Sequence, residues 1–304
     1  MTSTRPTSLR VLVTGSTGFI GARIIDALAD AGHRPVGCAR TEKIGRHVAA
    51  PFVAMDLAQP LSISRVLDEV RPDAIIHAAA ERDMPACERE PSRARVVNLD
   101  ATRGIAHWCA ANTAPLLFLS TDQVFDGVHG GYREEDPRNP VNVYGTTKAL
   151  AEDAVLAHAN TTIARVALTL GHSIERTRSP NEFIANKLRD GQRVPMFANE
   201  IRTPVLAHDV AIALTDLLAM PSRPRIIHLA GPDTVSRLEM GVTIARAYHL
   251  DETMLDASKY VAPPQGLRRA ENTALNTDLA QRTLPRPPRG MAAMAAFLAA
   301  TEPK

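Results

Sequence analysis

Short apolar segments alternate with amphipathic segments through the first half of the chain. The apolar segments, which have the lengths typical of buried strands, lie at residues 9–15, 34–39, 51–55, 73–80, 114–120 and 161–168. Between them, apolar residues recur at helical spacing, as in residues 19–32 and 92–112. Because the strands show no alternation of apolar and polar positions, they predict a parallel sheet covered on both faces. The expected fold class for residues 9–168 is therefore a doubly wound α/β domain.

The second half of the chain has a different pattern. From about residue 170 the sequence becomes more polar, and proline recurs often. Helical spacing predicts helices over residues 181–190, 206–219, 236–249 and 289–300. We expect a smaller, mostly helical substrate-binding cap formed by residues 169–202 and 231–304. Segment 203–230 is expected to return to the sheet, because its RIIHLAG sequence is strand-like, and the polar residues 1–8 predict a flexible tail.

Composition removes several classes of function. The 304-residue chain has a formal net charge of +2, which leaves no electrostatic footprint for nucleic acid or an anionic membrane. No stretch has the roughly 18 consecutive apolar residues of a membrane helix, and the first residues lack the apolar core of a signal peptide. The three cysteines and ten histidines show no metal-ligand spacing. We expect a cytoplasmic protein with a small-molecule substrate and no metal.

A glycine-rich loop follows the first predicted strand. In VTGSTGFIG, Gly15 permits a tight turn, Gly18 allows a pyrophosphate to approach the backbone, and Gly21 allows close packing of helix on strand. The helix N-terminus then offers free N–H groups to phosphates. This motif predicts a Rossmann-type dinucleotide site. Its other expected contacts are Thr17, Phe19, Ile20, Leu57, Ala78, Ala79 and Ala80, in the same loop or beside the ends of the third and fourth strands.

The end of the second predicted strand indicates which dinucleotide is bound. An NAD-binding chain usually carries a carboxylate there, whereas this chain has Arg40, with Lys43 near it. A guanidinium suits the 2′-phosphate of NADP(H), although Glu42 keeps NAD(H) open and Arg40 could also be a solvated surface charge. Asp56, after the third strand, is placed to accept a hydrogen bond from adenine. A role for Asp56 in the loop or in helix capping is equally compatible with its position.

Tyr144 and Lys148 lie four residues apart in NPVNVYGTTKALAED, residues 139–153. On a helix they share one face, one turn apart. A lone pair of this kind is ordinarily a packed tyrosine beside a solvated lysine. A nearby ammonium, however, stabilises phenolate and lowers the pKa of a phenol from its usual value of about 10. The pair is therefore a candidate for proton transfer to a carbonyl oxygen.

Six motifs occur in order along most of the chain: TGSTGFIG, IIHAAA, VVNLDATRGI, LSTDQVFDG, YREEDPRNPVNVYGTTKALAE and RTPVLAHDVAIAL. In order and spacing they resemble the extended short-chain dehydrogenase/reductase family, and most closely its dTDP-4-dehydrorhamnose reductase branch. The segments VGCAR and AAERDM are also similar to the regulatory β subunit of methionine adenosyltransferase, which binds NADP and serves a partner protein. The resemblance implies an NADPH-dependent reductase acting on a nucleotide-linked 4-keto-6-deoxy sugar.

The resemblance also implies roles for individual residues. Tyr144 would be the general acid, and Lys148 would hold the nicotinamide ribose. A hydroxyl at the end of the fifth strand would orient the substrate carbonyl, and counting back from the STDQVF motif favours Thr121 over Ser120. Asn98 matches an asparagine that supports the active-site lysine through water and would belong to the cofactor site. An incidental helix asparagine is the alternative for Asn98.

The substrate side departs from the branch. Gln123 replaces a usual aromatic residue, and Leu168 stands where a tryptophan usually lies against the sugar. The loop after the fourth strand is also unusual, and the family's RTP motif begins at Arg202. The expected substrate contacts are Glu81, Arg82, Thr121, Asp122, Gln123, Leu168 and Arg202.

These departures leave several functions open. A reductase of a non-sugar ketone or imine would explain Gln123 and Leu168. A non-catalytic, NADP-binding regulatory subunit is a further alternative, and epimerase or dehydratase activity is a weaker one, because Gln123 stands where dehydratases commonly have glutamate. A homodimer is common in the family, but no motif in this sequence demonstrates it.

Overall fold

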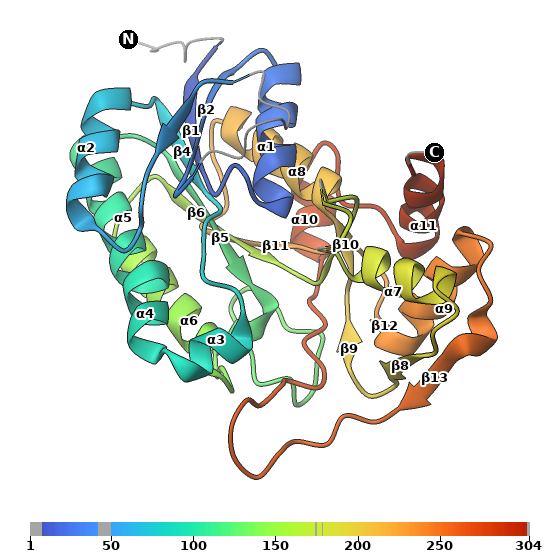
Figure 1. Ribbon diagram of the computed structural model, residues 1–304. Coiled ribbons are helices and arrows are strands. Elements are labelled where there is room, and N and C mark those ends of the chain that lie inside the picture. The colour runs from blue at the N-terminus through green and yellow to red at the C-terminus, as the bar shows by residue number, and fades with distance from the viewer. Residues whose placement is uncertain (1–7, 42–49, 174, 178, 303–304) are drawn as a thin grey trace.

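The computed structural model describes residues 8–41, 50–173, 175–177 and 179–302 (Figure 1). Most of the predicted tail, together with Glu42 and Lys43, lies outside these residues. Within the described part, seven strands form one parallel sheet in the order β11-β6-β5-β4-β1-β2-β3. Their bounds are β1 Arg10–Thr14, β2 Arg34–Ala39, β3 Phe52–Ala54, β4 Ala74–His77, β5 Leu116–Thr121, β6 Thr161–Val166 and β11 Ile226–Leu229. The predicted parallel, doubly wound fold is confirmed.

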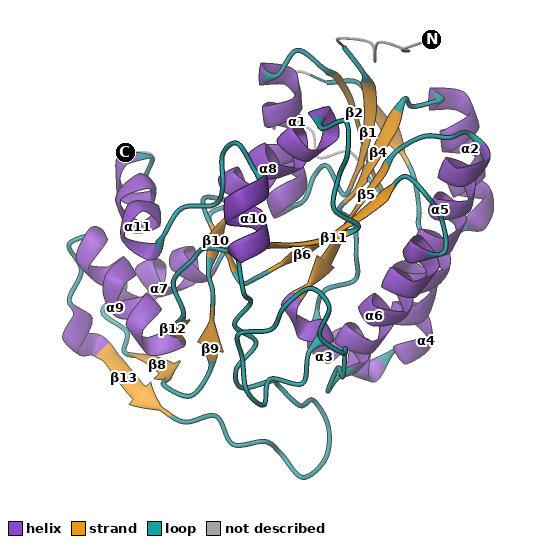
Figure 2. Cartoon of the chain, turned by 180° about the vertical axis from the view of Figure 1, so that it is seen from behind, coloured by secondary structure: helices purple, strands orange, loops and turns teal. Residues whose placement is uncertain are grey.

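Helices cover both faces of this sheet (Figures 1 and 2). One face carries α1 Phe19–Asp30, α8 Ala207–Ala219 and α10 Asp278–Thr283, whose apolar residues share a core with the strands. The other carries α2 Pro60–Val70, α5 Ala101–Ala111 and α6 Val143–Leu156. The central strands β4, β5 and β6 are buried throughout, which explains why their sequences are largely apolar, whereas the edge strand β3 is partly exposed.

The helix expected over residues 92–112 is interrupted. The structure has α3 Met84–Arg89, α4 Pro91–Arg95, a π-helical segment over Val96–Asp100, and then α5. A π-helical turn widens the backbone spiral, and such turns are often found at functional sites. Here the widened turn contains Asn98, whose side chain reaches the loop after β4.

The cap has its own apolar core, formed by α7 Pro180–Arg189, α9 Arg237–Ala247 and α11 Met291–Ala300 with neighbouring strands. Ser179 and Ser236 begin α7 and α9 with capping boxes to Glu182 and Glu239, so the sequence marks both helix starts. Short strand pairs complete the cap and its junction: β8 Val194–Phe197 with β13 Leu255–Ser258, β9 Ile201–Arg202 with β12 Val235–Ser236, and β7 Thr169–Leu170 with β10 Val205–Leu206. These short strands were not predicted.

The strand order reverses between β1 and β4, so this is the switch point at which the loops diverge to opposite faces. Segment 203–230 supplies β11, which pairs with β6 at the edge of the sheet as its sequence indicates. The division of the chain into a cofactor domain and a substrate cap stays a prediction.

Candidate active site

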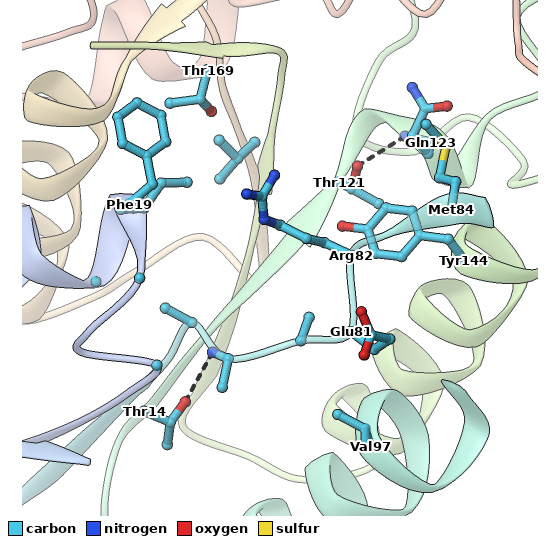
Figure 3. A pocket seen from close by; sticks show the side chains of 18 of the residues that line it. Thr14, Phe19, Glu81, Arg82, Met84, Val97, Thr121, Gln123, Tyr144 and Thr169 are labelled. Carbon is cyan, nitrogen blue, oxygen red and sulfur yellow. Dashed lines mark hydrogen bonds between the residues drawn. The ribbon is translucent and has the colours of Figure 1, made fainter. Parts of the chain in front are cut away.

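A cleft of ≈ 920 Å³ lies at the carboxyl ends of the strands, between the sheet and the cap (Figure 3). The loop after β1 forms one end of the cleft, and residues of the cap form the other. The predicted contacts that line the cleft are Gly15, Thr17, Gly18, Phe19, Ile20, Arg40, Asp56, Leu57, Ala78, Ala79, Ala80, Glu81, Arg82, Thr121, Asp122, Gln123, Tyr144, Leu168 and Arg202. Folding thus brings together residues that are separated by as much as 187 positions (15 to 202).

The glycine loop has the geometry that its spacing predicts. Gly15 has φ = +69°, and a Cβ there would lie 2.9 Å from the Cα of Ala79. A Cβ on Gly21 would lie 2.1 Å from the carbonyl oxygen of Gly15. Gly18 is the N-cap of α1 and supplies no capping side chain, so the first N–H groups of the helix remain available to an anion. The loop therefore fits the diphosphate of a dinucleotide.

Two buried hydroxyl–imidazole contacts support this loop from below. His77 Nδ1 lies 2.6 Å from Thr14 Oγ1, and His77 Nε2 lies 3.0 Å from Thr102 Oγ1. Thr14 Oγ1 also accepts a hydrogen bond of 3.0 Å from the backbone N–H of Ala79. Burial lowers the pKa of His77 to about 3, and the positive charge of Lys148 adds to the lowering. A neutral imidazole thus links β1 to β4 directly beneath the cleft.

Asp56 combines two of the roles that its position allows. It lines the cleft, and its carboxylate also accepts hydrogen bonds from the N–H of Ala58 at 3.0 Å and from Gln59 Nε2 at 3.4 Å. Arg40 lines the same end of the cleft at the end of β2. Both side chains thus line the cleft, and their roles toward a cofactor stay predictions.

Asn98 does not line the cleft formed by the described residues, and it makes no contact with Lys148 there. Its side-chain oxygen accepts a hydrogen bond of 2.8 Å from the N–H of Glu81, and its Nδ2 donates to the carbonyl oxygen of Glu81 at 3.0 Å. Nδ2 also donates to Thr147 Oγ1 at 3.1 Å. The expected role of Asn98 at the cofactor site stays a prediction. Its side chain joins the loop after β4 to helix α6.

Tyr144 and Thr121 approach each other inside the cleft (Figure 3). Asn142 begins α6 by accepting a hydrogen bond of 2.8 Å from the N–H of Gly145, which fixes the direction of the Tyr144 side chain. Thr121 ends β5, and its Oγ1 accepts a hydrogen bond from the N–H of Gln123 and donates to Asp122 Oδ1. Two hydroxyl groups thus converge where a substrate oxygen could accept hydrogen bonds from both.

The expected lowering of the Tyr144 pKa is wrong for this structure. Burial raises the pKa of Tyr144 to about 12, and this outweighs a lowering effect from its hydrogen bond with the Thr121 side chain. The nearby negative charge of Asp122 adds to the rise, whereas the positive charge of Arg82 opposes it. At neutral pH the phenol is therefore fully protonated, as a proton donor must be.

Lys148 is 2% exposed and does not line the cleft formed by the described residues. Its Nζ donates a hydrogen bond of 2.6 Å to the carbonyl oxygen of Leu119 and lies 3.9 Å from the ring centroid of Phe118. Burial lowers the pKa of Lys148 to about 7, although the carboxylate of Glu152 opposes this shift. The sequence spacing therefore places Tyr144 and Lys148 on one helix, but only Tyr144 is in the cleft.

The substrate end contains most of the charge. Asp122 is buried, accepts a hydrogen bond of 2.6 Å from Thr273 Oγ1, and lies 3.8 Å from Arg202 Nε. Arg82 extends into the cleft between Phe19 and Tyr144 (Figure 3). The positions that depart from the branch, Gln123 and Leu168, both line this region, so the departures concern cleft residues.

Sequence reasoning missed four charged residues of the cleft: Arg93, Glu200, Arg237 and Arg269. They come from separate segments, and no short motif unites them. The SRLE spacing at 236–239 is a capping-box signal that could have placed Arg237 at the start of a helix. Nothing in the sequence around Glu200 or Arg269 indicates that these two side chains meet.

Two absences concern the described residues alone. None of their helices is both long and apolar enough to cross a membrane. These residues also contain no group of three or more His, Cys, Asp or Glu side chains arranged to hold a metal ion.

The fold and the cleft define a Rossmann-type α/β protein with a glycine loop at the strand switch point. Residues 9–301 match the family described as RmlD substrate binding domain, and the chain belongs to this family. It is 30% identical over 273 residues to methionine adenosyltransferase 2 subunit beta from Bos taurus, covering 88% of this chain and 80% of that protein. Both resemblances inferred from the motifs are confirmed.

Solved structures show the same architecture. A hypothetical dTDP-4-dehydrorhamnose reductase from Sulfolobus tokodaii superposes with a TM-score of 0.80 at 27% identity, over 91% of this chain and 95% of that one. The dTDP-4-dehydrorhamnose reductase of Bacillus anthracis, in complex with NADP, has a TM-score of 0.83 at 19% identity, over 98% and 100% of the two chains. These similarities confirm the fold class.

Proposed function

We propose that the chain is an NADPH-dependent reductase of the extended short-chain dehydrogenase/reductase type, which reduces the keto group of a nucleotide-linked 4-keto-6-deoxy sugar. The observation that carries the proposal is the convergence of the Tyr144 and Thr121 side chains in a cleft that begins at a dinucleotide-type glycine loop. Family membership and the reductases among its structural neighbours support the same reaction.

The residues of the cleft fit a nicotinamide dinucleotide. The Gly15–Gly18–Gly21 loop and the N-terminus of α1 would hold the diphosphate, and Arg40 would hold the 2′-phosphate of NADP(H). The Bacillus anthracis relative was crystallised with NADP, which supports this cofactor. A bound reduced nicotinamide would supply the hydride.

The chain's own groups would manage the substrate oxygen. In our proposal, Thr121 and Tyr144 donate hydrogen bonds to the carbonyl oxygen, and Tyr144 transfers its proton as negative charge develops there. The phenol is protonated at neutral pH because burial raises its pKa. Lys148, whose Nζ donates to the carbonyl oxygen of Leu119, would support this transfer by its positive charge.

Replacing Tyr144 by Phe tests the proposal. With NADPH and dTDP-4-dehydrorhamnose, we expect Tyr144→Phe to lower kcat by about 100-fold to 10,000-fold, the range that a positioned general acid contributes. The affinity for NADPH should stay within about twofold, because Tyr144 would not hold the adenosine or diphosphate. Loss of reduced-nicotinamide absorbance measures turnover, and fluorescence titration measures cofactor binding.

Tyr248→Phe is the matched control, because Tyr248 lies in the cap and its hydroxyl accepts a hydrogen bond from Asn181 rather than facing the cleft. It should retain full activity. Undiminished turnover by Tyr144→Phe would remove the proposed acid.

A second candidate function is that of a cofactor-binding regulatory subunit. Two observations favour it: a relative at 30% identity is named as a subunit, and Lys148 does not line the cleft formed by the described residues. NADPH binding without any reductase activity, together with a stoichiometric partner that co-purifies, would support this function.

If reduction occurs only with carbonyl compounds that lack a nucleotide, the substrate is instead a non-sugar ketone or imine, as Gln123 and Leu168 leave open. The homodimer and the cytoplasmic location stay predictions.

A further inference from the structure

The cap end of the cleft contains a cluster of arginines, defined here as Arg202, Arg237 and Arg269. Strand β9 contains Arg202 and pairs antiparallel with β12, which ends immediately before Arg237. The segment that follows Arg269 runs beside β9, because Ile201 donates its N–H to Glu271 and accepts from the N–H of Thr273. Three segments that are distant in sequence thus deliver like charges to one place.

The three guanidinium groups differ in how fully they are bonded. Arg202 donates to the carbonyl oxygens of Ile201, Glu271 and Ala270 at 2.7–2.9 Å, so its donors are largely used by the backbone. Within the described residues, the side chain of Arg237 has no hydrogen-bond partner, and that of Arg269 forms only an ion pair. The donors free for a ligand are therefore those of Arg237 and Arg269.

Glu200 lies inside this cluster. It is 3% exposed, and its carboxylate lies 3.5 Å from Arg269 Nη1 and 3.7 Å from Arg202 Nη2. Its carbonyl oxygen accepts a hydrogen bond of 2.9 Å from the N–H of Arg237, which fixes the backbone. Neither carboxylate oxygen accepts a hydrogen bond from any described residue, and Oε1 is fully buried.

This arrangement is unusual for a buried carboxylate, which ordinarily accepts hydrogen bonds from its partners. Within the described residues, the carboxylate of Glu200 has ion-pair partners but no hydrogen-bond donor. The charges of Glu200 and the arginines act on one another: burial lowers the pKa of Arg237 to about 10, Glu200 opposes the shift, and Arg202 and Arg269 add to it. A carboxylate in this position offsets positive charge that would otherwise face the cleft.

We propose that Glu200 is a built-in counter-ion that competes with the anionic group of the substrate for Arg237 and Arg269, and so weakens the binding of phosphate-bearing ligands. The inference rests on the proposed function only in taking this cleft as the site of a phosphate-bearing sugar. Its physical basis is that the ligand anion and Glu200 are like charges that are attracted to the same guanidinium groups, with Glu200 3.5 Å from that of Arg269 and acting on that of Arg237 by its charge. Moderated affinity would allow the product to leave.

The proposal is tested with inorganic pyrophosphate and dTDP as probes, titrated calorimetrically into the full-length protein. Glu200→Gln keeps the size of the side chain and removes the charge. We expect it to bind both probes about tenfold more tightly, which corresponds to about 1.4 kcal/mol. Glu271→Gln is the matched control, because it removes the same charge from an exposed side chain on the neighbouring segment, outside the cleft. It should change the dissociation constants by less than about twofold.

A double-mutant cycle locates the effect. Arg237→Gln should weaken pyrophosphate binding, and the gain from Glu200→Gln should shrink in that background, because the competed guanidinium is absent. Unfolding curves check that each variant is folded. Unchanged or weaker binding by Glu200→Gln, or failure of both probes to bind it, would overturn the proposal. Such a result would mean that Glu200 instead positions the arginines or accepts a ligand hydroxyl.

The probes contain no keto group, so this test is independent of turnover. Tighter pyrophosphate binding by Glu200→Gln in a protein that does not oxidise NADPH would sustain the counter-ion role and reject the reductase. Turnover with dTDP-4-dehydrorhamnose, without the expected change in pyrophosphate binding, would sustain the reductase and reject the counter-ion role.

Discussion

The two ends of the cleft are lined by different kinds of chemical group. At the cofactor end, the walls are backbone and small side chains, such as Gly15, Gly21 and Ala79, and the critical contacts are steric. At the substrate end, the walls carry buried charges such as Arg237 and Glu200, and the critical contacts are electrostatic. Gly15 and Gly21 at the cofactor end leave no room for an added Cβ, whereas the substrate end depends on the balance of charges.

The difference is also one of chain connectivity. Each cofactor-side segment directly follows a strand of the sheet, so neighbouring strands deliver their loops to one edge. The substrate end instead combines β9, the start of α9 and the segment near Arg269. We therefore expect changes at the cofactor end to act mainly on folding and cofactor binding, and changes at the substrate end to act mainly on ligand affinity.

The largest effect is expected from Gly21→Ala. Its Cβ would lie 2.1 Å from the carbonyl oxygen of Gly15, and neither backbone can move without opening the glycine loop. We predict a destabilisation of about 3 kcal/mol and loss of NADPH binding. Chemical denaturation and cofactor titration measure the two effects.

Gly104→Ala on α5 is the control, since nothing lies within 4 Å of the added Cβ, and it should be neutral or stabilising by up to about 1 kcal/mol. Equal behaviour of the two variants would contradict the steric account.

The next largest effect concerns pH and compares buried imidazoles in two regions. Burial lowers the pKa of both His77, beneath the glycine loop, and His228, beside Arg165, to about 3. Between pH 6.5 and 3 the unfolded chain binds protons that the folded chain does not, so the free energy of unfolding falls as pH decreases. Each histidine contributes up to about 1.4 kcal/mol per pH unit in this window.

Urea unfolding at pH 6 and pH 4.5 should show a smaller decrease in the free energy of unfolding for His77→Gln and for His228→Gln than for the unchanged chain. Parallel declines would show that these imidazoles become protonated in the folded state.

The smallest effect is expected from Arg40→Ala, at the outer rim of the cofactor end. If the guanidinium pairs with the 2′-phosphate, its loss should weaken NADPH binding about tenfold, or about 1.4 kcal/mol. NADH has no 2′-phosphate, so its affinity should change little. Parallel titrations of both proteins with NADPH and with NADH measure the loss of affinity for each cofactor. An equal loss for both cofactors would assign Arg40 to the adenosine or to the loop, and not to the phosphate.

Some predictions about the site failed for identifiable physical reasons. The spacing of Tyr144 and Lys148 predicts one helix face, which is correct, but not the acceptor that Lys148 finds in the carbonyl oxygen of Leu119. The pKa argument considered the neighbouring ammonium and could not include burial, which is the larger influence on Tyr144. The role of Asn98 was inferred from the family resemblance and stays a prediction; the sequence did not indicate the π-helical turn from which its side chain reaches the backbone of Glu81.

The sequence by itself determined the parallel sheet, the glycine loop and the helix starts at Asn142, Ser179 and Ser236. These features depend on local patterns: apolar runs, glycine spacing and capping residues within a few positions of one another. Only the tertiary structure decided that Glu200, Arg237 and Arg269 share one end of the cleft. Their meeting depends on a two-residue strand pair and on backbone hydrogen bonds between segments about 35 and 70 residues apart, which no local pattern encodes.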